Sequence, residues 1–110
     1  MPSQIRDVCM YITSEKAIAR LAKNCFDEAA LAAVFQNNQK EIEQTVGEWF
    51  GQGSVKHDAV SRVLVKISKS ALLFHPELQS AETFIVDCAN AECRNLFEQA
   101  THRLALAHYT

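Results

Sequence analysis

Apolar residues recur every three or four positions along most of the chain, which is the spacing of one face of an α-helix. The pattern predicts N-terminal helices within 1–25 and longer helices over 27–50, 57–74 and 80–108. The first segment is divided near Thr13 and Ser14, either of which could cap its second piece. No internal repeat or linker separates the segments, so they predict one domain spanning residues 1–110.

The breaks between these segments carry the residue types that start and end helices. Asp27 and Ser80 precede apolar periodic stretches and are typical N-cap residues. Residues 51–53, Gly-Gln-Gly, stop the second helix because glycine is favoured just after a helix C-terminus. Proline at position 76 disfavours helical geometry in His75 and suits a new first turn.

Composition supports the same fold class. The chain has 110 residues, of which 48% are apolar, with only three glycines and two prolines to make strand turns. A chain of this size buries enough surface for a core without metal or disulfide staples. We therefore predict an all-α domain, a compact bundle of about four or five helices.

Charge and apolar runs restrict the classes of partner. The formal net charge is −2, so no global basic field would attract nucleic acid or an anionic membrane. The N-terminus lacks a signal peptide's apolar core, and no apolar run approaches the length of about 20 residues that spans a bilayer. We expect a cytoplasmic protein without membrane association and with reduced cysteines.

We find no constellation of residues that predicts catalysis, a metal or a cofactor. The four cysteines lack the CxxC spacing of a zinc site. Cys88 could be a nucleophile, but its apolar stripe has no histidine at helical spacing, which favours core packing. Glu41 and Glu43 lie on different sides of a helix, which favours a solvated face over paired acid–base chemistry. His57 and His75 flank predicted helix ends, where caps or surface roles are ordinary.

A basic stripe is predicted on the third helix. Its members, Arg62, Lys66 and Lys69, fall at intervals of four and three residues, and Lys56 precedes them. The stripe could meet phosphates or an acidic partner, or it could be an ordinary solvated helix face. Trp49 and Phe50 at a helix end favour core packing over a platform for base stacking.

Four segments then follow one another in an order that resembles a known family. They are ARLA at 19–22 with FDEAALAAVF at 26–35, DAVSRVLVKI at 58–67, FHPEL at 74–78, and SAETFIVDCANAECRNLF at 80–97. Together, from about Ala19 to Gln99, they resemble region 2 of the bacterial sigma-70 family, particularly the small extracytoplasmic-function sigma factors. The resemblance implies an all-helical, non-enzymatic domain of transcription initiation.

The resemblance also implies where partners would bind. In that family the third helix docks on core RNA polymerase, a role that would fall to Asp58, Ser61, Arg62 and Lys66, with Lys69 extending the same stripe. The last helix and the loop before it engage the melted −10 promoter strand. That role would fall to Phe84, Asn90 and Arg94 with the loop at 75–80.

The chain departs from the family at these positions. Ser61 and Arg62 stand where the family has Gln-Glu, which reverses the charge of the docking face, and Phe84 stands where it has tryptophan. Most of the basic residues expected near DNA are acidic or neutral here, and loss of cations weakens phosphate binding. An alternative is therefore a stand-alone adaptor or regulator that binds another protein through the basic stripe and has lost promoter binding. The oligomeric state stays open.

Overall fold

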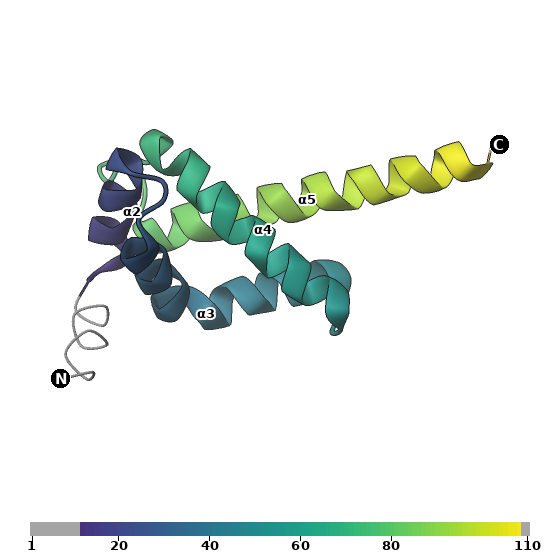
Figure 1. Ribbon diagram of the computed structural model, residues 1–110, viewed down its shortest axis with the longest axis horizontal. Coiled ribbons are helices and arrows are strands. Elements are labelled where there is room, and N and C mark those ends of the chain that lie inside the picture. Colours follow the sequence, from purple (N-terminus) through teal and green to yellow (C-terminus); the bar gives the residue numbers. More distant parts are fainter. Residues whose placement is uncertain (1–11, 109–110) are drawn as a thin grey trace.

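The chain folds into helices joined by short connections (Figure 1). The structure, a computed structural model, describes residues 12–108. Its elements are α2 (Ser14–Lys23), α3 (Glu28–Phe50), α4 (Ser54–Ser70), the 3₁₀ turn η1 (Ala71–Leu73) and α5 (Ala81–His108). No strand occurs among these residues, which confirms the predicted all-α class. The part of the N-terminal helix prediction before residue 12 lies outside the described residues.

The first two helices begin where their capping residues predict. Thr13, not Ser14, caps α2, because its hydroxyl accepts a hydrogen bond from the backbone N–H of Lys16 at 3.2 Å. Asp27 caps α3, and its carboxylate accepts from the N–H of Ala30 at 3.0 Å. The same carboxylate pairs with Arg20 of α2 at 2.9 Å, which ties the two helices together.

A kink divides α3 at Asn38, whose backbone is non-helical at φ −128° and ψ 17°. The side chain of Asn38 is only 3% exposed and donates to the hydroxyl of Ser14 and to the carbonyl of Val34, both at 2.9 Å. A buried side chain that bonds to its own helix competes with the regular backbone ladder. The apolar periodicity alone predicted an uninterrupted helix over 27–50.

The third predicted helix differs from the structure at both ends. It begins at Ser54 rather than 57, because Gly53 supplies the N-cap position with a φ of 142° that only glycine adopts readily. His57 therefore lies inside α4 rather than beside its end. The α-helix stops at Ser70 and tightens into η1, and Phe74 is extended just before His75 and Pro76.

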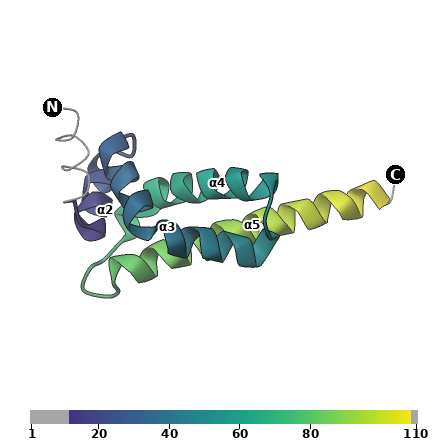
Figure 2. The ribbon, with the colours of Figure 1, turned by 90° about the horizontal axis from the view of Figure 1, so that it is seen from below.

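Helices α3, α4 and α5 lie alongside one another, and α2 crosses one end of them near η1 (Figures 1 and 2). Their facing sides form one core of small and branched apolar residues. Its largest fully buried side chains are Ile18, Leu21, Val34, Ile42, Val46, Val63, Ile67, Ile85 and Cys93. At the end of the bundle away from α2, the C-terminal part of α5 continues into solvent (Figure 1).

Candidate partner-binding surface on α4

The basic stripe predicted on the third helix lies on the solvent side of α4. Arg62 and Lys69 are exposed and Lys66 is partly exposed. The opposite side of the same helix carries Val63 and Ile67, which are fully buried in the core. Because spacings of three and four residues place side chains on one helix face, the three cations share one side of α4, with Lys66 at its partly buried edge near Cys88.

No carboxylate forms an ion pair with Arg62, Lys66 or Lys69 within residues 12–108. The acidic side chains that form ion pairs there are Asp27, which pairs with Arg20, and Glu77, which lies 3.7 Å from the ring of His75. The charges of Arg62, Lys66 and Lys69 are therefore available to a ligand. Such a stripe can attract an acidic surface or phosphate groups over about a Debye length.

Lys56 does not belong to the stripe. It lies about 120° round the helix from Arg62. Its ammonium donates to the side chain of Gln52 at 2.9 Å.

The other two residues assigned to polymerase docking, Asp58 and Ser61, are exposed. The exposed side of α4 therefore carries one carboxylate at its N-terminal end and three cations further along.

The three residues assigned to promoter DNA differ in exposure: Phe84 is buried, whereas Asn90 and Arg94 are exposed. Phe84 is 5% exposed and packs against Phe74, with ring centroids 5.1 Å apart, so no face of its ring is free to stack on a base. The aromatic ring of Phe84 belongs to the core, so the assignment of Phe84 as a DNA contact has no support from its burial. Its place on the buried side of α5 follows from tertiary packing, which the resemblance did not convey.

The other two assigned residues remain at the surface. The side-chain oxygen of Asn90 accepts a hydrogen bond from the indole N–H of Trp49 at 3.1 Å. Trp49 also contacts Phe97, with ring centroids 5.9 Å apart. Arg94 is exposed. Asn90 therefore helps to hold α3 against α5. Among Phe84, Asn90 and Arg94, the exposed Arg94 is the residue that could contact a phosphate by its charge.

Two of the described cysteines, Cys88 and Cys93, are buried. Burial raises the pKa of the Cys88 thiol to about 11, an effect that nearby Lys66 partly opposes. Burial likewise raises the pKa of Cys93 to about 11. Both thiols are protonated at neutral pH, and a protonated thiol is a poor nucleophile. Among the described cysteines Cys25 is exposed.

A metal site and a membrane-spanning helix each have structural requirements, which can be compared with the described residues. In the described part of the chain no group of three or more His, Cys, Asp or Glu side chains is arranged to hold a metal ion. None of the helices between residues 12 and 108 combines the length and apolar character that crossing a membrane requires.

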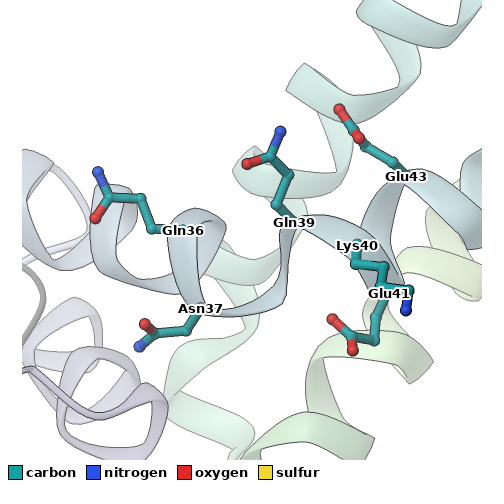
Figure 3. A pocket seen from close by; sticks show the side chains of 6 residues that line it. All are labelled: Gln36, Asn37, Gln39, Lys40, Glu41 and Glu43. Atoms are coloured by element: carbon teal, nitrogen blue, oxygen red, sulfur yellow. The ribbon is translucent and has the colours of Figure 1, made fainter.

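A polar depression lies on the outer side of α3 beside its kink (Figure 3). Its lining side chains point in different directions rather than toward one centre (Figure 3). They are Gln36, Asn37, Gln39, Lys40, Glu41 and Glu43. Without convergent groups or burial, this depression has no feature of a ligand site.

An apolar region beside the basic stripe was missed by reasoning from the sequence. Phe26 is 84% exposed, Leu72 is 72% exposed and Val65 is 49% exposed. Phe26 directly precedes the N-cap Asp27, a position whose apolar side chain often packs against the fifth residue beyond it, here Leu31. That signal was present in the sequence, but it would have predicted a covered Phe26 rather than an exposed one.

The described residues form a small all-α bundle with a basic stripe on the solvent side of α4. Comparison with known proteins adds no relative, since no family model, no curated protein and no solved structure matches the chain.

Proposed function

We propose that the protein is a non-enzymatic docking domain that binds a partner protein through the basic stripe of α4. The observation that carries this proposal is the outward placement of Arg62, Lys66 and Lys69 without a carboxylate partner among residues 12–108. A rigid helix that presents unpaired charges offers both orientation and electrostatic selectivity to a protein surface. Core RNA polymerase is the partner that the resemblance to sigma region 2 implies.

Promoter DNA is not included in the proposal. Base stacking needs an accessible aromatic face, and Phe84 is packed against Phe74. Phosphate binding needs several cations, and Arg94 is the one cation of the assigned trio. A domain that docks on polymerase without reading the promoter would act as a regulator of initiation.

A salt-titrated pulldown of core RNA polymerase tests the proposal. We expect retention by the wild-type chain at low salt and at least about tenfold weaker retention by an Arg62→Glu, Lys69→Glu variant, because like charges at a docking surface repel. The matched control is a Lys40→Glu, Arg103→Glu variant, which reverses two exposed cations on α3 and α5. Equal weakening in both variants would show an effect of net charge alone and would contradict docking through α4.

The second candidate is an adaptor for an acidic partner other than polymerase. The pair Ser61 and Arg62 stands where sigma factors carry Gln-Glu, and this favours the adaptor, since a cation replaces the carboxylate of the docking face. The same pulldown distinguishes the two candidates. Absence of polymerase retention at low salt, together with charge-dependent binding of an acidic helix, would select the adaptor.

A further inference from the structure

A hollow of about 340 Å³ opens between the start of α3 and the outer side of α4. Apolar side chains of Phe26, Leu31 and Val65 line it, together with Cys25. Isolated exposed apolar residues are common on protein surfaces and need no explanation. Apolar side chains that converge on one concave site are different, because a concave site can enclose a side chain of a partner.

A second hollow lies further along, beside η1 and α2. Arg62, Val65, Lys69 and Leu72 follow one another at spacings of three and four residues, so they lie along one side of α4 and η1. Lys69 and Val65 line the first hollow, and Leu72 lines the second, of about 420 Å³, against α2. The two hollows therefore lie along the same side of α4 and η1, at Val65 and Lys69 and then at Leu72.

Three lysines and two glutamates line the two hollows, although the whole chain carries a net charge of −2. The charged side chains that line the two hollows are Lys16, Lys23, Lys69, Glu15 and Glu28. Arg62 and Lys66 extend the positive side along α4. An apolar hollow beside Lys69, Lys66 and Arg62 is complementary to a helix with an apolar face and acidic flanks.

We propose that the hollow formed by Phe26, Leu31 and Val65 receives a large apolar side chain of an acidic amphipathic helix in the partner protein. This inference rests on the proposed function and extends it from a charged stripe to a defined anchor site. Anchor residues in well-packed pockets contribute much of the energy of protein interfaces, and surrounding charges steer and orient the encounter. The partner helix lies along α4, with its acidic residues facing Lys69 and Arg62.

Peptide titration of the isotope-labelled chain tests the inference. The probe is a synthetic helix of about 20 residues with leucines on one face and glutamates on both flanks, long enough to form several turns. We expect amide shifts centred on Phe26, Leu31, Val65 and Lys69 in nuclear magnetic resonance spectra. A Phe26→Ser, Val65→Ser variant weakens binding about tenfold, the effect of removing an interface anchor.

Two controls separate the anchor from general stickiness. A Leu104→Ser variant removes a leucine that is 70% exposed on the overhanging end of α5, far from α2 (Figure 1), and leaves peptide affinity unchanged. A peptide with lysines in place of the glutamates binds at least about tenfold more weakly. Phe26 is so exposed that its replacement leaves the fold intact, which thermal unfolding verifies.

Several results would overturn the inference. They are absence of shifts at the hollow, equal binding of the lysine peptide, shifts at the hollow that grow with protein concentration alone, and preferential binding of vesicles of anionic phospholipid. The polymerase pulldown keeps this test separate from the proposed function. Normal, stripe-dependent retention of polymerase by the Phe26→Ser, Val65→Ser variant would refute the anchor and leave docking through α4 in place.

Discussion

At the scale of single residues, Asn38 shows how a buried polar group shapes a helix. Its amide bonds to Ser14 of α2 and to Val34 of its own helix at the point where α3 kinks. Ser14 and Val34 are both buried. Loss of either hydrogen bond would therefore leave a buried polar group without a partner, which costs free energy of folding. The apolar core tolerates this amide because its hydrogen bonds are made within the protein.

Replacing Asn38 by alanine should destabilise the chain by about 1–3 kcal/mol, because the Ser14 hydroxyl loses its bonding partner in a buried site. Urea unfolding followed by the fluorescence of Trp49, the sole tryptophan, measures this cost. The neighbouring, exposed Gln39→Ala is the control and should change stability by less than about 0.5 kcal/mol. A loss from Asn38→Ala no larger than the control would remove the structural role assigned to the amide.

At the scale of elements, Asp27 joins two helices by capping one and pairing with the other. Its pKa lies below the ordinary value of 3.8, mainly because the N–H of Ala30 donates to the carboxylate and then because Arg20 does so. The ionised carboxylate is thus favoured in the folded chain. Helix caps and dipole interactions act at such termini, so the stability of the α2–α3 junction depends on this charge.

The acid dependence of stability should therefore diminish when Asp27 is replaced by asparagine, which still caps but does not ionise. A depressed carboxyl pKa contributes stability above 3.8 that is lost as the pH falls through the lower folded value. Urea midpoints from neutral pH to below 3.8 test this, with Glu41→Gln on the exposed side of α3 as control. An unchanged acid slope in Asp27→Asn would contradict the role of this group.

At the scale of the whole molecule, the core ends well before α5 does. The chain extends 57 × 32 × 22 Å, and the long dimension follows α5, whose 28 residues span about 42 Å. Trp49 packs on Phe97, but residues 98–107 are all exposed. The last turns of α5 are therefore stabilised by helical propensity and by continuity with the packed part of the helix, and not by burial.

A chain that ends at Ala100 should keep nearly the full stability of the bundle, within about 0.5 kcal/mol, because the removed side chains among the described residues are exposed. Urea unfolding followed by Trp49 fluorescence again provides the measurement. The contrasting variant is Ile85→Ala, which opens a cavity at a fully buried position and should cost about 2–5 kcal/mol. A comparable loss on truncation would mean that the overhang supports the core.

Much of the fold was predictable from residues alone. The periodicity and the caps located α3 and α5 to within one residue of their observed starts and predicted the all-α class. The stripe of Arg62, Lys66 and Lys69 was predictable because helical spacing determines which side chains share a face. The early start of α4 depended on the backbone of Gly53, and the kink at Asn38 depended on a hydroxyl from another helix.

The sequence by itself determined which segments become helices and which residues align along each one, because these properties depend on neighbours within a few positions. Only the tertiary structure decided that Phe84 is buried against Phe74 and that Phe26 is left exposed beside Val65 and Lys69. Both outcomes depend on how helices far apart in the chain pack against one another. Local periodicity contains no information about how helices distant in the chain pack, so the apolar hollow beside the basic stripe became visible only in three dimensions.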